Sequence, residues 1–145
     1  MKNILILASI LLFTTTLFAD ICGYEEKKKI TFLRDGREIV TFDIGIADAL
    51  NTRARGLMYC ASFRKDKGLL FVFDIKGPKS FWMKNTMIPL GIIFISDDMK
   101  VLSVQYGAPF SMKHVDDNGS VKYVLEVNFD EASDIKPDDI VLITP

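Results

Sequence analysis

The sequence has little net charge and no strongly basic region. Its 145 residues contain 18 Lys and Arg against 19 Asp and Glu, which gives a formal net charge of −1. The one cluster of lysines, Lys27–Lys29, follows Glu25 and Glu26, so its charge is partly offset and indicates a solvated segment. Domains that bind nucleic acid carry a basic patch or stripe. We therefore expect no nucleic-acid partner.

Residues that ligate metals or act as nucleophiles are scarce. The chain has one histidine, His114, and two cysteines. A structural zinc site needs about four Cys or His ligands, so these residues do not indicate one. The sequence contains no C-x-x-C and no G-x-S-x-G, and Ser111 lies three residues before His114, a spacing typical of no catalytic motif. We expect no cofactor.

Carboxylates for a hydrolase would have to come from scattered acids such as Asp43, Asp74 and Glu126, and nothing in the sequence brings two of them together. Glu126 falls on the polar side of an alternating strand. We expect it to point outward and to pair with Arg55 or with a lysine on a neighbouring strand. The sequence therefore does not favour an enzyme, although a small envelope hydrolase stays an alternative.

Long hydrophobic runs are confined to the N-terminus, where residues 1–19 have the pattern of a signal peptide. Lys2 supplies the positive end, residues 4–13 the apolar centre, and Ala19 the small residue at the cleavage site. The run is shorter than the roughly 20 apolar residues of a transmembrane helix. We expect an exported protein, periplasmic or secreted, that meets the membrane only if this segment stays uncleaved.

The two cysteines, Cys22 and Cys60, would enter an oxidising compartment after export. There a pair of cysteines is more often bridged than free, so they are a candidate disulfide. Cys22 belongs to residues 20–29, which we expect to form a flexible N-terminal arm. Residues 30–145 then form a single domain of ordinary size.

Alternating polar and apolar residues predict short strands along the whole domain. The turn dipeptide Asp35-Gly36 joins the first two strands in a hairpin. We expect further turns at residues 76–79 and 116–119. The pattern predicts an all-β fold, a β-sandwich or partly closed barrel of seven to nine short strands with one short helix. The clearest strands are residues 30–34, 38–46, 68–73, 91–96, 101–106, 121–129 and 140–143.

The short helix is predicted over residues 49–57. Asp48 precedes it as a candidate N-cap, and Gly56 marks its end. Leu50, Ala54 and Leu57 fall on one side at helical spacing, which predicts that this side packs on the sheet.

The most informative segment is Phe81–Ile95, which places the sole tryptophan beside a compact polar cluster. Trp82 would form the wall of a shallow binding site, Asn85 and Thr86 would orient a polar ligand, and Lys84 or Arg55 would meet an anionic group. The helix would also present Met58. A purely structural role stays open, because Asn and Thr also bond to nearby backbone at the end of a strand.

The same segment carries a family resemblance. The blocks W-M-K-N-T with I-P-L, R-G-L-M followed by G-L-L-F-V-F, and V-L-E-V-N span roughly residues 40–143, and they resemble the domain of unknown function 192 family. This resemblance implies a small, mostly β protein, often exported, without an assigned activity. One departure concerns Gly91, because the family usually has an acidic residue after I-P-L. If that acid is catalytic in relatives, this chain lacks it.

Methionines suggest a second kind of site. Met83 and Met87 are spaced M-x-x-x-M, Met112 and His114 are spaced M-x-H, and Trp82 could pack over them. Thioethers are soft ligands that select Cu(I). Methionine also fills gaps in cores, so core packing is the simpler interpretation. A Cu(I)-binding protein stays an alternative to the leading hypothesis, a non-catalytic module of the periplasm or cell envelope that binds a small polar ligand or an envelope protein.

Overall fold

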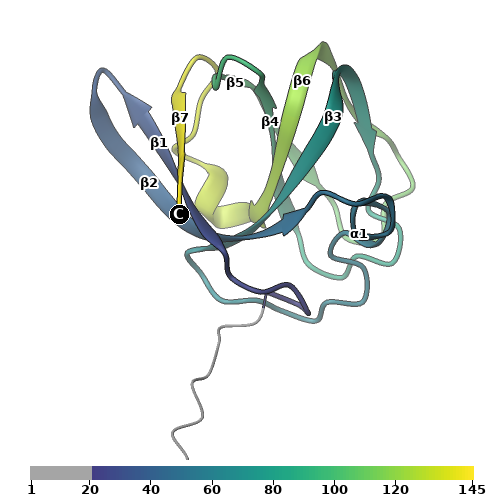
Figure 1. The fold of residues 1–145 in the computed structure, drawn as a ribbon. Coiled ribbons are helices and arrows are strands. Elements are labelled where there is room, and N and C mark those ends of the chain that lie inside the picture. The colour runs from purple at the N-terminus through teal and green to yellow at the C-terminus, as the bar shows by residue number, and fades with distance from the viewer. Residues whose placement is uncertain (1–20) are drawn as a thin grey trace, which may run out of the picture.

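The computed structural model describes residues 21–145, so the predicted signal peptide lies outside the described residues. These residues form an all-β domain with one short α-helix (Figure 1). Seven strands make one mixed sheet in the order β5-β4-β6-β3-β2-β1-β7. Their bounds are Lys28–Arg34 (β1), Arg37–Ala47 (β2), Lys67–Phe81 (β3), Leu90–Ser96 (β4), Val101–Gly107 (β5), Val115–Asn128 (β6) and Ile140–Thr144 (β7). The predicted fold class is confirmed.

The sheet curls into a partly closed barrel. Its two edges, β5 and β7, meet at one end, where Val101 N–H donates to Asp139 O at 3.0 Å and Asp138 N–H donates to Val101 O at 2.9 Å. Arg34 Nε also donates to the buried Asp139 carboxylate at 2.7 Å. The interior is filled by apolar side chains from every strand, including Phe32, Phe42, Leu70, Ile93, Val101, Leu125 and Val141. A 3₁₀ helix, η1 (Phe129–Ala132), packs beside β4.

The outer face of β3, β4 and β6 is buried as well. It is covered by the N-terminal residues Ile21 and Tyr24, by Leu57 and Cys60 in the loop after the helix α1 (Leu50–Arg55), and by the segment that contains Met83 and Ile88. A second apolar cluster forms between this layer and the sheet. This layer and the sheet also enclose a pocket.

The N-terminal segment differs from the flexible arm that the sequence predicts. Ile21 and Tyr24 are buried against the outer cluster, and Lys28 already belongs to β1. Glu26 pairs with the buried Lys67 at 3.1 Å, and Lys67 also contacts Asp43 at 2.7 Å. Lysine pairing keeps the pKa of Asp43 at about 2, against its burial. Two apolar side chains and this ion cluster fix a segment whose run of charges suggests solvent exposure.

Two predicted turns are instead parts of long strands. Residues 76–79 lie inside β3 and residues 116–119 inside β6, and the β3–β6 ladder continues past them with register shifts on either side of Gly77. Gly77 has a φ of +147°, a conformation that glycine adopts most easily. β-Bulges insert extra residues into a strand, so β3 and β6 continue through these turn-forming residues and do not end there.

The helix is shorter than predicted and oriented differently. Leu50 is 81% exposed, so it is not on the packed side, whereas Leu57 after the helix is fully buried. The N-cap is Ala49 rather than the predicted Asp48, and the Thr52 hydroxyl, three residues on, accepts a hydrogen bond from Ala49 N–H at 3.0 Å. Gly56 ends the helix with a φ of +50°, as expected. Within residues 21–145 no helix is long and apolar enough to cross a membrane.

Candidate functional site

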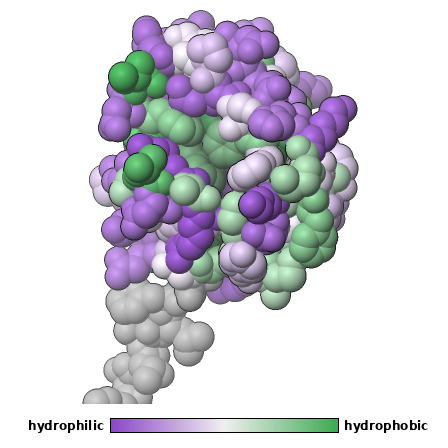
Figure 2. All heavy atoms as spheres, turned by 90° about the vertical axis from the view of Figure 1, so that its right-hand side faces the viewer, coloured by the Kyte–Doolittle hydropathy of each residue, from purple (hydrophilic) through white to green (hydrophobic). Residues whose placement is uncertain are grey.

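A pocket of about 250 Å³ opens between α1 and the outer face of β3. Figure 2 shows this side of the molecule, where apolar surface lies in a hollow among hydrophilic side chains. Residues 53–58 form one wall, Phe71, Phe73, Ser80 and Phe81 of β3 form another, and Trp82, Thr86 and Glu126 complete the lining. The pocket therefore combines several aromatic rings with few polar groups.

Four of the six predicted site residues line this pocket: Arg55, Met58, Trp82 and Thr86. They come from two segments far apart in the sequence, the end of α1 and the residues after β3. Lys84 and Asn85 are not among the lining residues. The Lys84 ammonium lies over the Trp82 ring, 5.1 Å from its centroid.

Asn85 shapes the segment behind the pocket. Its φ of +55° completes a turn in which Thr86 N–H donates to Met83 O at 3.1 Å. Asparagine tolerates this left-handed conformation better than most residues. Its side-chain amide donates to the Tyr59 hydroxyl at 2.9 Å, and Tyr59 N–H donates to Asn85 O at 2.8 Å. These contacts favour the purely structural role for Asn85, which the sequence leaves open beside ligand binding.

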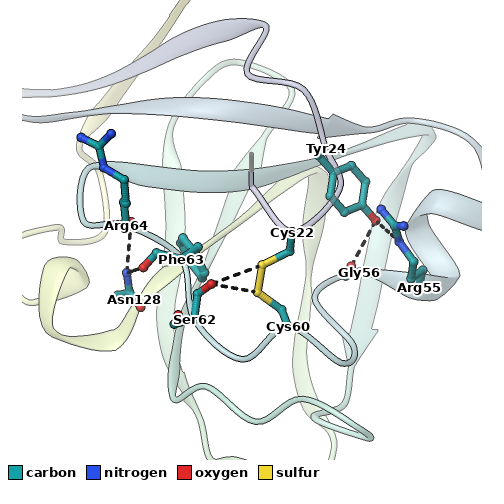
Figure 3. The surroundings of a disulfide bond; sticks show 9 residues. All are labelled: Cys22, Tyr24, Arg55, Gly56, Cys60, Ser62, Phe63, Arg64 and Asn128. Carbon is teal, nitrogen blue, oxygen red and sulfur yellow. Dashed lines mark hydrogen bonds between the residues drawn. A yellow bond between two sulfur atoms is a disulfide. The ribbon is translucent and has the colours of Figure 1, made fainter. Parts of the chain in front are cut away.

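The two arginines of the helical wall are engaged by neighbouring groups. Arg53 donates to Val72 O at 2.8 Å, lies over the Phe73 ring and sits 3.8 Å from the Asp74 carboxylate. The Arg55 guanidinium stacks on Tyr24, 4.3 Å from the ring centroid (Figure 3). Both side chains therefore help to fix α1 against its surroundings while they line the pocket.

Glu126 is buried, although the sequence predicts that it is exposed. It is only 5% exposed, whereas the sequence predicts an outward, paired carboxylate. The alternation in β6 is as expected, but the outer face is covered by the layer that contains α1, so a side chain on that face is buried. Burial alone raises the pKa of Glu126 to about 8. Among the described residues none forms a hydrogen bond or ion pair with its carboxyl group, and since no fully buried side-chain oxygen there lacks a partner, the carboxyl oxygens keep access to the pocket.

A Ser–His contact lies at the mouth of the pocket. Ser80 Oγ is 2.6 Å from His114 Nδ1, and the His114 ring lies 6.4 Å from that of Trp82. Asp116 is 4.0 Å from the same Nδ1 atom. In a catalytic triad the acid and the serine bind opposite nitrogens of the imidazole, so this arrangement is not a triad. Asp43 lies in the Lys29 and Lys67 ion cluster, and Asp74 is exposed.

The four candidate copper ligands differ in their surroundings. Met83 is fully buried in the outer apolar cluster, and its sulfur packs so close to Gly107 that an added Cβ there would lie 2.6 Å away. Met87, Met112 and His114 are exposed. Over residues 21–145 no group of three or more His, Cys, Asp and Glu side chains is arranged to hold a metal ion. Met83 thus fills the core, as its simpler interpretation expects.

The predicted disulfide is present. Cys22 and Cys60 are bonded, with Cα atoms 5.6 Å apart, and the bond ties the N-terminal segment to the loop after α1 (Figure 3). Two residues beyond Cys22, the Tyr24 hydroxyl contacts Thr52 O at 3.0 Å and Gly56 O at 3.1 Å. The disulfide and Tyr24 together tie the helical wall of the pocket to the N-terminal segment.

The comparison with known protein families is decisive for this chain. Residues 31–143 match the family model for domain of unknown function 192, described as an uncharacterized group. The chain belongs to this family. No curated protein matches it.

Two solved structures of similar fold also match the chain. One is a protein of unknown function from Novosphingobium aromaticivorans, with 29% identity, a TM-score of 0.74, and coverage of 79% of this chain and 83% of that one. The other, from Sinorhizobium meliloti, is described provisionally as a transcription regulator. It has 29% identity, a TM-score of 0.75, and coverage of 79% of this chain and 92% of that one.

Gly91 departs from the residue expected in this family for a steric reason. A Cβ atom at this position would lie 2.3 Å from Ala132 Cβ in η1, which is far inside contact distance. Gly91 is not among the residues that line the pocket. An acid at this position would therefore be directed at η1 and not at the pocket.

Proposed function

We propose that this protein is a non-catalytic binding module of the cell envelope that holds a small ligand in the pocket between α1 and β3. The observation that carries the proposal is the convergence of Arg55, Met58, Trp82 and Thr86 on one concavity with a buried carboxyl group, Glu126, at its lining. Ligand sites are mostly apolar hollows with a few convergent polar groups. This pocket has that composition.

The envelope location rests on the N-terminal sequence and on the cysteine pair. A disulfide such as Cys22–Cys60 persists in oxidising compartments and is rare in the cytosol. Expression of the full chain followed by N-terminal sequencing of the mature protein tests this part. We expect a mature chain that begins at Asp20 in the periplasmic or secreted fraction. A cytoplasmic protein that retains Met1 or Lys2 would contradict it.

Trp82 provides a direct reporter of binding, because it is the sole tryptophan, lines the pocket and is 42% exposed. We expect that at least one class among small neutral, anionic and cationic probes changes Trp82 fluorescence saturably. Ala54→Phe should abolish this change, since Ala54 is an exposed pocket residue of α1.

Leu50→Phe is the matched control, because Leu50 is on the same helix, exposed and outside the lining. The binding proposal fails if no probe class gives a saturable change, or if Ala54→Phe binds as well as Leu50→Phe does.

A small hydrolase is the second candidate, favoured by the short contact between Ser80 and His114 at the pocket mouth. A buried acid with a raised pKa, such as Glu126, is also common at catalytic sites. The arrangement around Nδ1 argues against a serine nucleophile. Ester and amide probes test the hydrolase hypothesis. Hydrolysis by the wild type that disappears in Ser80→Ala would support the hydrolase. Equal rates of hydrolysis in the wild type and in Ser80→Ala would exclude Ser80 as the nucleophile.

Regulation of transcription, which the S. meliloti relative is provisionally described to perform, is not part of this proposal. The net charge of −1 and the partly neutralised lysine run provide no basic surface of the kind that DNA-binding domains use. The proposed export would also keep the chain away from DNA.

A further inference from the structure

We propose that the pocket takes a cationic group, an alkylammonium or quaternary ammonium head, for which Glu126 is the counter-ion and the aromatic rings of β3 and Trp82 are the walls. This inference rests on the proposed binding function and names the chemical class of its ligand.

The position of Glu126 in the sheet explains why it lacks a protein partner. Its cross-strand neighbours are Leu69 on β3 and Ile92 on β4, and both are apolar and fully buried. Within residues 21–145 the Glu126 carboxyl group forms neither a hydrogen bond nor an ion pair, yet no fully buried side-chain oxygen there lacks a partner, so the carboxyl oxygens are open to the pocket rather than sealed in the core. A carboxyl group at the floor of a largely apolar pocket is poorly solvated, so a cation that enters the pocket would stabilise its charged form. The pocket is the side from which a partner can reach it.

The walls of the pocket suit a cation. Phe71, Phe73, Phe81 and Trp82 all line it. Phe71 and Phe81 meet edge to face, with centroids 5.0 Å apart, so their rings point in different directions around the space. Aromatic faces attract ammonium groups, and cages of such rings are a common way to bind quaternary ammonium. Protein cations already lie over two of these rings, Arg53 and Lys79 over Phe73 and Lys84 over Trp82, so a bound ammonium group would share the cage with these side chains or displace them.

The arginines in the lining do not pair with the Glu126 carboxylate. The Arg53 guanidinium is bound by backbone carbonyls and lies near Asp74, and that of Arg55 is stacked on Tyr24. Burial is the sole cause of the raised pKa of Glu126, so neither guanidinium stabilises its charged form. The other polar groups at the pocket are the Ser80 and Thr86 hydroxyls, with His114 at the mouth beside Ser80. The place beside the carboxylate is therefore left for a ligand.

Binding of a cation must be coupled to loss of a proton from Glu126. With a pKa of about 8, roughly a tenth of the protein carries the charged carboxylate at pH 7 and about half at pH 8. Apparent affinity falls in proportion to the competent fraction. We expect cation binding to tighten by about fifty-fold between pH 6 and pH 8 and to level off above pH 9.

The test compares three probes of the same shape and different charge: choline, its neutral isostere 3,3-dimethylbutan-1-ol, and the anion 3,3-dimethylbutanoate. Binding to the mature protein is followed by the NMR signal of the Trp82 indole N–H at pH 8.5. We expect choline to bind at least ten-fold more tightly than either isostere. Glu126→Gln should reduce choline affinity about ten-fold or more and leave the neutral isostere unchanged, and Leu50→Phe should bind as the wild type does.

Three results would overturn the inference. Equal or tighter binding of the alcohol or the carboxylate would exclude a cation site while leaving the pocket as a binding site. Unchanged choline binding in Glu126→Gln or Ala54→Phe would place the cation elsewhere. No binding of any of the three probes at tens of millimolar would reject the ligand class, while the broader fluorescence screen decides the binding function separately.

Discussion

The guanidinium carbon of Arg55 lies over Tyr24, 4.3 Å from the ring centroid, and its Nε is 3.3 Å from the Tyr24 hydroxyl (Figure 3). That hydroxyl also reaches the carbonyl oxygens of Thr52 and Gly56 at the end of α1. A residue of the N-terminal segment thus sets the position of a pocket arginine. The contact links the first described residues of the chain to the site.

Tyr24→Phe should loosen the end of α1. The change removes the hydroxyl and leaves the carbonyls of Thr52 and Gly56 without it, at a cost of about 1 kcal/mol in the free energy of unfolding. Urea unfolding measures this cost, and hydrogen exchange of the Gly56 amide should become faster. Tyr106→Phe is the control, because Tyr106 is half exposed, and we expect it to change stability by less than about 0.5 kcal/mol. Equal effects of the two substitutions would show that the Tyr24 contacts contribute nothing.

Replacing both cysteines by serine should cost more. The bond between Cys22 and Cys60 closes a loop with a sequence separation of 38, for which the chain-entropy model gives about 4 kcal/mol. Urea unfolding of the wild type and of Cys22→Ser/Cys60→Ser measures the difference. Thiol titration of the unreduced wild type should find no free thiol, and two free thiols would contradict the bridge. We also expect weaker protection of the Tyr24 amide in the double variant.

Stability should depend on pH through Glu126. Its folded pKa of about 8 lies above the ordinary value of 4.5, so between these values the folded state holds a proton that the unfolded state has lost. The stability of the wild type, measured against that of Glu126→Gln, should therefore be greatest below pH 4.5 and should decrease by up to about 1.4 kcal/mol per pH unit until about pH 8.

Urea unfolding of both proteins at pH 5, 6.5 and 8 checks this difference. Asp43 and Asp139 have pKa values that are lowered by their basic partners, so their contributions to stability are lost only at more acidic pH. They therefore do not affect the difference between pH 5 and pH 8. Parallel pH profiles for the wild type and Glu126→Gln would contradict the buried acid.

Gly91 should tolerate no side chain while Ala132 is present. In Gly91→Ala the new methyl group would meet Ala132 Cβ at 2.3 Å, so we expect a loss of about 1–3 kcal/mol from overpacking. Adding Ala132→Gly should recover part of that loss, with a favourable coupling of at least about 0.5 kcal/mol in a double-mutant cycle. Additive effects of the two substitutions would mean that η1 moves away from β4 instead.

The sequence predicts the sheet well because alternation is a local property. Leu125 and Val127 face the barrel interior, as the period of two in β6 requires. The same alternation places Glu126 correctly on the opposite face but cannot show that this face is covered. The cover comes from the loop after α1 and the N-terminal segment, which are distant in sequence. A signal was present, however: Glu126 is the one charged residue in the apolar run Val124–Val127.

The candidate site could be predicted only in part for a similar reason. The W-M-K-N-T block marks the right region, and Trp82 and Thr86 line the pocket. The conformation of Asn85, with its positive φ, turns its side chain to Tyr59, and residue type alone does not reveal this choice. Ile21 and Tyr24 are two apolar residues beside a run of charges, and their burial depends on a surface formed by other segments.

The parallel strands β2 and β3 are joined by residues 48–66, which include α1 and Cys60 but contribute no strand to the sheet. This connection supplies one wall of the pocket, whereas the barrel supplies the other. Substitutions in the connection can reshape what the pocket accepts while every strand pairing is retained. Members of this family with one common scaffold should therefore diverge in ligand preference chiefly through these nineteen positions, and exchanging the connection between two members should transfer that preference.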